Sequence, residues 1–96
     1  MAIKTIIRRK ATKVFEDPQL LELLRELRTQ AFAQPGFISG ETLRRVDRPG
    51  DLVVIGTWKS QEAWNAWKGS PERAEIQRRI DNLLGTATEY EVYEYL

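Results

Sequence analysis

Histidine and cysteine, two side chains often used for catalysis and metal binding, are both absent from this sequence. Their absence removes the commonest general base at neutral pH, the thiolate nucleophile, the disulfide and the cysteine type of zinc site. The sequence also has no glycine-rich phosphate loop, no dinucleotide fingerprint and no Ser-His-Asp set. Acid and base chemistry would fall to carboxylates, to tyrosines or to a substrate itself. All three tryptophans, by contrast, lie in one stretch, TWKSQEAWNAWKGSPE at residues 57–72.

Arginines are the second group of side chains that could do chemistry. Arg8 and Arg9, and likewise Arg44 and Arg45, are neighbours in stretches that alternate like strands. One arginine of each pair should therefore point to each face of a sheet. An inward arginine could hold an anionic oxygen, and we take Arg8 as the candidate. The alternative is a solvated arginine, or one paired with a carboxylate of the last predicted strand.

Length and charge describe one small domain, residues 1–96. Fifteen basic and fourteen acidic residues give a net charge of +1, which argues against binding of nucleic acid or of an anionic membrane. No apolar run approaches the roughly 20 residues needed to span a bilayer. The first residues, MAIKTIIRRK, lack the long apolar segment of a signal peptide. We therefore expect a cytoplasmic protein.

The elements that must position these side chains begin with a strand and a helix. β-Branched residues predict the strand over Ile3–Thr12. Asp17 and Pro18 form a helix start, and the helix must end before Pro35. Leucine and alanine side chains recur along it at spacings of three and four, at Leu20, Leu23, Leu24, Leu27 and Ala31. This spacing predicts an apolar stripe that faces a core.

A β-hairpin is predicted next. Phe37–Val46 alternates as a strand, residues 47–51 form a turn, and Leu52–Lys59 is the second strand. The segment LVVI within that second strand has no polar alternation. We therefore expect both of its faces to be covered, one by helices and the other by a partner.

The last part of the chain predicts two helical pieces and a closing strand. Ser60 caps the first piece, and Ser70 with Pro71 starts a second one that runs through Leu84. The alternating stretch TATEYEVYEYL, residues 86–96, is the closing strand. The order β-α-β-β-α-β is that of an α+β, ferredoxin-like fold with one antiparallel sheet and helices on one face. Its uncovered face predicts a homodimer in which two sheets cover each other as a dimeric α/β barrel.

Two motifs add a family resemblance to this pattern: QPGF at residues 34–37 and VVIGTWKSQEAWNAWKGSPE at residues 53–72. Together with the order of elements, they make essentially the whole chain resemble the antibiotic biosynthesis monooxygenase family of dimeric ferredoxin-like proteins. In that family the third strand ends in tryptophan, and a Ser-x-Glu-Ala-aromatic helix start and a Ser-Pro step follow. The matching residues are Trp58, Ser60, Glu62, Ala63, Trp64, Ser70 and Pro71. In cofactor-free members, oxygen reacts with a phenol or hydroquinone whose deprotonated form supplies the electron.

The chain also departs from the family pattern. Many members carry two histidines where this sequence has Trp67 and Glu72. The haem-degrading branch keeps a tryptophan at the place of Trp67 and binds haem iron through a histidine ten residues later, where Gln77 stands here. A neutral amide is a poor iron ligand, so the sequence disfavours haem degradation. We predict a protein without metal or other cofactor.

Four residues are candidates for substrate binding: Trp67, Trp64, Gln77 and Arg8. Trp58 and Trp64 occupy core positions of the family, which favours a packing role for them. Trp67 lies one helical turn after Trp64, on the side where the family's pocket opens, and could be the wall for a flat ligand or a packing residue. Gln77 could point into the same pocket or be a partly exposed helix residue. No catalytic residue is assigned.

The leading hypothesis is a homodimeric, cofactor-independent monooxygenase that acts on a small planar aromatic or quinol-like substrate. The alternative is a non-catalytic dimeric module of the same fold that binds a small hydrophobic molecule. A third possibility is a structural dimer whose pocket is filled by Trp64 and Trp67, which the volume of the pocket distinguishes from the other two.

Overall fold

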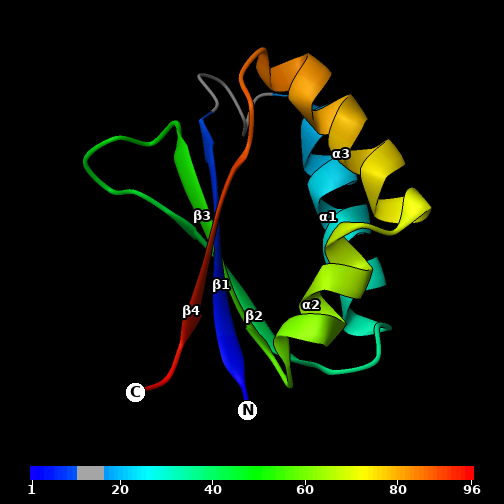
Figure 1. The fold of residues 1–96 in the computed structure, drawn as a ribbon. Helices are drawn as coiled ribbons and strands as arrows, with labels where there is room; N and C mark the ends of the chain where they lie inside the picture. The colour runs from blue at the N-terminus through cyan, green and yellow to red at the C-terminus, as the bar shows by residue number, and fades with distance from the viewer. Residues whose placement is uncertain (11–16) are drawn as a thin grey trace.

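One four-stranded antiparallel sheet with helices on one of its faces makes up the computed structural model, which describes residues 1–10 and 17–96 (Figure 1). In chain order the elements are β1 (Ile3–Lys10), α1 (Pro18–Phe32), β2 (Phe37–Arg44), β3 (Asp51–Trp58), α2 (Gln61–Lys68), α3 (Pro71–Leu84) and β4 (Glu89–Glu94). The strand order is β2-β3-β1-β4. This arrangement confirms the predicted ferredoxin-like fold. The last two residues of the strand predicted over Ile3–Thr12 lie outside the described residues.

The β2–β3 hairpin is slightly shorter than predicted. β2 ends at Arg44 rather than Val46, because the chain then enters the turn, in which the N–H of Asp51 donates back to the carbonyl oxygen of Arg48 at 2.9 Å. β3 follows its pairing with β1. Asp51 pairs with Lys10 and Trp58 with Ile3, the two ends of β1, so β3 starts and ends one residue before the predicted range Leu52–Lys59.

β4 is also shorter than predicted. Within the described residues it pairs with β1, with Arg8 opposite Glu89 at one end and Ile3 opposite Glu94 at the other. Before Glu89 the ladder pairing stops, although the Thr86 hydroxyl still donates to the carbonyl oxygen of Lys10 at 3.5 Å, and after Glu94 the chain passes the first residue of β1. The strand predicted over residues 86–96 therefore reduces to Glu89–Glu94.

The predicted helix starts are confirmed by their capping hydrogen bonds. The carboxylate of Asp17 accepts from two backbone N–H groups of α1, and Ser60 and Ser70 each accept one at the start of α2 and of α3. The two predicted helical pieces are thus two separate helices, α2 and α3. α3 ends at Gly85, whose φ of 71° is a left-handed conformation that glycine adopts without strain. No described helix is long and apolar enough to cross a membrane.

The core lies between the three helices and the inner face of the sheet. Alternate residues of β1 and β3 point to it, together with one stripe of each helix. Its buried apolar residues are Ile3, Ile7, Leu20, Leu23, Leu27, Leu52, Trp58, Trp64, Trp67, Ile76 and Ile80. All three tryptophans therefore belong to one cluster, which joins the end of β3 to α2.

In the part of the chain that the structure describes, no helix covers the outer face of the sheet (Figure 1). In LVVI, Leu52 and Val54 line up with inward residues of β1, whereas Val53 and Ile55 point outward and are half-buried. Leu43 of β2 lies opposite Val53 on this outer face and is exposed. The helices of this chain therefore cover the inner face of LVVI, as predicted. The partner that was predicted to cover its outer face stays a prediction.

Candidate functional site

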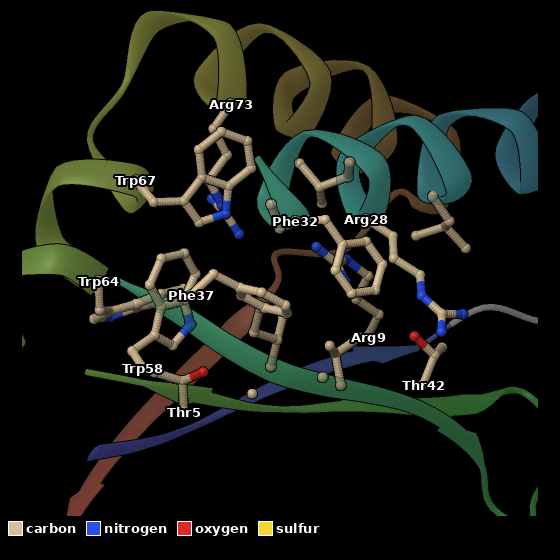
Figure 2. Close-up of a pocket in the computed structure, with 17 residues that line it drawn as sticks. Thr5, Arg9, Arg28, Phe32, Phe37, Thr42, Trp58, Trp64, Trp67 and Arg73 are labelled. Atoms are coloured by element: carbon tan, nitrogen blue, oxygen red, sulfur yellow. The ribbon is translucent and has the colours of Figure 1, made fainter. Parts of the chain in front are cut away.

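A cavity of about 80 Å³ lies between the inner face of the sheet and the helices (Figure 2). Its lining is mostly apolar and aromatic, with a few hydroxyl and guanidinium groups. The lining residues are Thr5, Ile7, Arg9, Leu24, Leu27, Arg28, Ala31, Phe32, Phe37, Gly40, Thr42, Val54, Gly56, Trp58, Trp64, Trp67 and Arg73. A concave apolar site with a few convergent polar groups is the usual form of a small-molecule site.

Two glycines of adjacent strands form the floor of the cavity. Gly40 of β2 and Gly56 of β3 are register partners in the sheet. A Cβ atom on Gly56 would lie 2.8 Å from Thr5 Oγ1 and 3.3 Å from Trp58 Nε1, and one on Gly40 would lie 3.2 Å from the Phe37 ring. The Cβ position of Gly56 is thus occupied by Thr5 and Trp58, and that of Gly40 is crowded by Phe37, so glycine at these positions lets those side chains pack closely over the strands at the floor of the cavity. Glycines inside strand patterns are a sequence signal for such a close approach, and our sequence reading did not use it.

Aromatic rings form a continuous wall beside this floor. They run from Phe32 through Phe37, Trp58 and Trp64 to Tyr90, with successive centroids 5.1, 5.2, 5.8 and 6.2 Å apart. These tilted and edge-to-face contacts are the favoured geometries of aromatic pairs. They fix the orientation of the rings that line the cavity.

Trp64 and Trp67, both predicted candidates, line the cavity together. α2 carries them three residues apart, so they lie on one face of that helix, and each is almost fully buried. Figure 2 shows the ring of Trp67 on the helix side, beside the side chain of Arg73, and the ring of Trp58 on the sheet side. The tryptophans leave space between the layers, so they do not fill the cavity completely.

Arg9 lines the cavity, whereas the candidate Arg8 does not. Arg8 points to the outer face of the sheet, where its Nε donates to the carboxylate of Glu91 at 2.9 Å. Arg9 points inward and is only 3% exposed. Strand alternation required one inward arginine, and the register of β1 decides that it is Arg9.

Arg73 is a second cavity residue that the sequence reading missed. It is 2% exposed and reaches in from the first turns of α3 (Figure 2). Its Nη1 donates to the hydroxyl of Tyr90 at 3.0 Å, and its guanidinium lies 5.1 Å from the Tyr90 ring and 5.8 Å from that of Trp64. Cation–π contacts of this kind hold the guanidinium against the aromatic wall.

Gln77 holds the two arginines together from behind. Its Oε1 accepts from Nη2 of Arg9 at 2.8 Å and from Nη2 of Arg73 at 3.4 Å. Its Nε2 donates to Asp81 Oδ1 and to Thr88 Oγ1, both at 2.8 Å. The amide is thus occupied on both sides, and Gln77 is buried without lining the cavity. It has no free lone pair aimed at a ligand, which agrees with the sequence argument against iron ligation at this position.

The two buried arginines carry positive charge with little compensation. Burial away from water, and then the neighbouring charge of Arg73, lower the pKa of Arg9 to about 10, while Tyr90 and Asp81 act in the opposite direction. Arg9 therefore stays protonated at neutral pH. Neither arginine forms an ion pair with any residue of 1–10 or 17–96, and the Nε of each has no hydrogen-bond partner there.

The chemistry of this site is that of binding and charge stabilisation. No carboxylate is among the described lining residues, and the chain has no histidine, so the lining offers no ordinary general base. Within the described part of the chain, no group of three acidic side chains is placed to hold a metal ion. The cavity can desolvate a flat molecule, hold it between rings and present guanidinium groups to its edge.

Comparisons with known proteins agree with this fold. The family model for antibiotic biosynthesis monooxygenase matches residues 6–79. No curated protein sequence is significantly similar to the chain.

Among solved structures, a conserved protein from Methanosarcina mazei Go1 superimposes with a TM-score of 0.88 at 18% identity, covering 100% of this chain and 94% of that one. SnoaB, a cofactor-independent oxygenase from Streptomyces nogalater, gives 0.84 at 16% identity, with 99% and 93% covered. Rv0793 from Mycobacterium tuberculosis gives 0.84 at 23% identity, with 100% and 96% covered. At these identities the likeness shows the fold.

Proposed function

Since the chain belongs to the antibiotic biosynthesis monooxygenase family, we propose that it is a cofactor-independent monooxygenase that binds a small planar aromatic or quinol-like substrate in the cavity. The observation that carries this proposal is the cavity itself, in which three tryptophans and other apolar residues line the space above two paired glycines of the sheet. The floor and the rings suit a flat apolar molecule better than a sugar or a phosphate. The structural likeness to SnoaB, a cofactor-independent oxygenase, also supports the proposed activity.

The reaction draws its electrons from the substrate. A deprotonated phenol or hydroquinone gives an electron to O₂. In the net reaction with a naphthol or hydroquinone, a ring C–H carbon gains an oxygen atom and the ring is oxidised to a quinone. With an anthrone, whose phenol tautomer is the form that ionises, the ring CH₂ group becomes C=O. In each case the second oxygen atom leaves as water with the two hydrogens that the substrate loses. The protein's part is to exclude water, orient the ring and favour the deprotonated form. An apolar cavity with a few cationic groups is equipped for this part without a nucleophile.

The cavity must widen when such a substrate enters. Its volume of about 80 Å³ is below the range of about 300–1,000 Å³ that is usual for ligand pockets. Phe32 and Arg28, which stack on each other at 5.7 Å, are exposed lining residues at the end of α1. We expect this pair to turn outward on binding, because exposed side chains change rotamer readily.

A homodimer is part of the proposal. The outer face of the sheet presents Ile6, Val53, Ile55 and Leu43 side by side across three strands. Burial of these side chains against the same face of a second copy would remove an apolar surface from water. Such a contact is two-fold symmetric, as is common for dimers.

Oxygen consumption tests the proposed activity. Purified, metal-free protein is mixed with anthrones, naphthols and hydroquinones, and uptake is compared for wild type, Trp67→Phe and Trp67→Ala. We expect uptake above the uncatalysed rate, partial activity for Trp67→Phe, and a loss of at least about tenfold for Trp67→Ala, because the ring wall is gone. Removing a buried tryptophan costs roughly 3–5 kcal/mol of stability, so thermal unfolding of each variant is measured in parallel. The phenylalanine variant keeps the test valid if the alanine variant does not fold.

The same experiment distinguishes the non-catalytic alternative. Absence of uptake with every compound, together with quenching of tryptophan fluorescence by some of them, would contradict the monooxygenase and support a binding module. Uptake that Trp67→Phe and Trp67→Ala both retain in full would place the reaction elsewhere in the molecule.

A further inference from the structure

Two positive charges lie inside the protein without a matching negative charge among residues 1–10 and 17–96. Arg9 and Arg73 are 3% and 2% exposed, and their guanidinium groups share the same acceptor, Gln77 Oε1. Neither contacts a carboxylate in the described part of the chain. Buried charges in proteins are ordinarily paired, so this arrangement requires an explanation.

The nearest acid does not supply the missing charge directly. Asp81 reaches the arginines only through Gln77, and its Oδ1 is already an acceptor for Gln77 Nε2 and for Thr88 Oγ1, at 2.8 and 2.9 Å. One carboxylate behind an amide thus serves two cations. The amide oxygen accepts their hydrogen bonds but carries no net charge. The site is therefore positive on the side that faces the cavity.

Both cations lie at the cavity of the tryptophans. Figure 2 shows Arg73 reaching down from α3 beside Trp67, and Arg9 rising from the sheet toward the same space. The two residues come from opposite layers. A ring placed against the tryptophan wall would therefore present its edge to guanidinium groups rather than to apolar side chains.

We propose that the cavity takes its aromatic ligand as an anion, with a carboxylate or phenolate oxygen on the ring edge bound by Arg9 and Arg73. The buried guanidinium nitrogens that have no partner are the donors that such an oxygen would satisfy. The proposal rests on the proposed function in assuming that the cavity holds a planar aromatic molecule. What it adds to the proposed function is that this molecule is negatively charged and that Arg9 and Arg73 select for the charge.

The two arginines could take the place of a general base in the cavity. No described lining residue is a carboxylate, so the site has no ordinary group that removes a proton from a phenol. Two adjacent positive charges lower the pKa of a bound hydroxyl, because they stabilise its deprotonated form. A ligand that enters as an anion, or ionises on binding, needs no protein base.

Binding of a charged and a neutral probe of the same shape tests the proposal. The probes are 2-naphthoate, an anion at neutral pH, and 2-naphthamide, its uncharged counterpart, and binding is followed by tryptophan fluorescence and titration calorimetry. The variants are Arg9→Met and Arg73→Met. Their matched controls are Arg8→Met, which removes the neighbouring charge on the outer face, and Arg79→Met, which removes an exposed charge on the same helix.

We expect wild type to bind 2-naphthoate at least about tenfold more tightly than 2-naphthamide. Arg9→Met and Arg73→Met should lose this preference and still bind 2-naphthamide, and both controls should keep it. Arg9→Lys, which retains a positive charge, should restore part of the preference. Thermal unfolding of each variant, with and without 2-naphthoate, identifies any variant that fails to fold.

A third probe, 2-naphthol, separates the two sources of the oxyanion. Appearance of the naphtholate absorption band on binding at neutral pH would show that the site ionises a phenol. Preference for 2-naphthoate without that band would assign the site to carboxylates. Either result supports an anion site.

Equal binding of 2-naphthoate and 2-naphthamide in wild type would overturn the anion site while leaving the aromatic cavity in place. Loss of the preference in the two control variants as well would also overturn it, because the effect would then be one of net charge. Binding of neither probe would overturn both the anion site and the aromatic cavity. Anion-selective binding without oxygen uptake, in contrast, would contradict the monooxygenase alone.

Discussion

Arg9 places a positive charge in the interior at a site where water and carboxylates are both scarce. It is held by one strong hydrogen bond, to Gln77 at 2.8 Å, and is opposed by the charge of Arg73. Removing such a group in favour of an apolar one is often neutral or stabilising, because the desolvation cost disappears with the charge. Arg9 is thus better explained by what it can bind than by what it adds to stability.

The first prediction concerns Arg9→Met. We expect the free energy of unfolding at neutral pH to rise by about 1–2 kcal/mol. A chemical denaturation curve of wild type and variant measures it. A fall of more than about 1 kcal/mol would show that the arginine network is structural.

The difference in free energy of unfolding between wild type and Arg9→Met should also depend on pH, which gives a second readout. The pKa of Arg9 is lowered to about 10 in the folded state by burial and by Arg73, while Asp81 and Tyr90 act in the opposite direction. Below pH 10 the side chain is charged in both states, so the folded state bears the full cost of a buried charge. Above it the folded state releases its proton first, the unfolded state binds more protons, and wild type gains stability with rising pH. The advantage of Arg9→Met should therefore shrink above about pH 10, and a difference that stays constant there would contradict the assignment.

Among the elements, β2 and β3 determine the shape of the site through their glycines. Gly40 and Gly56 are neighbours in the sheet, and at each position a cavity-lining side chain occupies or crowds the space that a Cβ atom would need. In the middle of strands, glycine lowers stability, so its presence at two paired positions indicates a requirement for space.

The second prediction concerns these two positions. A methyl group on Gly56 would approach Thr5 Oγ1 to 2.8 Å, whereas one on Gly40 meets the edge of the Phe37 ring at 3.2 Å. We expect Gly56→Ala to lower the free energy of unfolding by about 1–3 kcal/mol and Gly40→Ala to cost less, because the ring of Phe37 can turn. Denaturation curves give the order. Quenching of tryptophan fluorescence by 2-naphthamide should weaken in both variants, and unchanged quenching in Gly56→Ala would place the ligand away from the glycine floor.

The helices position the rest of the site through their first turns. Ser60 and Ser70 fix the starts of α2 and α3. The two helices follow each other after a short connection, so that Trp67 in the last turn of α2 and Arg73 in the first turn of α3 reach the same cavity. This connection explains why cap residues remote from any ligand matter for the geometry of the site.

For the whole molecule, the asymmetry of the sheet is the dominant feature. Of the described helices, α1, α2 and α3 all cover one face, and none lies on the other (Figure 1). The outward side chains of Ile6, Val53 and Ile55 are half-buried by their neighbours in the sheet, and Leu43 beside them is exposed. An apolar stripe of this kind is a typical contact surface.

The third prediction is that the protein is a dimer in solution and that Ile55→Lys makes it a monomer. A lysine at the centre of the stripe would bury an unpaired charge in the contact, which is unfavourable. Light scattering at micromolar concentration measures the mass. Thr57→Lys, on the same face of β3 but beside the already charged Lys4, serves as the control and should remain closer to the dimer. A wild-type monomer under these conditions would contradict the two-fold contact.

The sequence by itself determined the types and order of the elements and the starts of the helices. Asp17, Ser60 and Ser70 with their following residues are local signals, and alternation or helical spacing in short windows predicted each strand and helix. These signals act between residues close together in the chain, so they can be recognised in the sequence without knowledge of the fold. The strand ends moved by a residue or more because they depend on the length of the neighbouring strand, which no local window contains.

Only the tertiary structure decided the contents of the site. Alternation showed that one of Arg8 and Arg9 points inward, but the register of β1 against β3 selects Arg9. The contact of Arg9 with Gln77 joins residues 68 positions apart, and the paired glycines come from different strands. Partners so distant along the chain leave no periodic trace in the sequence, because their separation is set by how the layers pack. The fold could therefore be predicted from local patterns. The positive charge and the glycines of the cavity could not, because they depend on which distant residues the packing of the layers brings together.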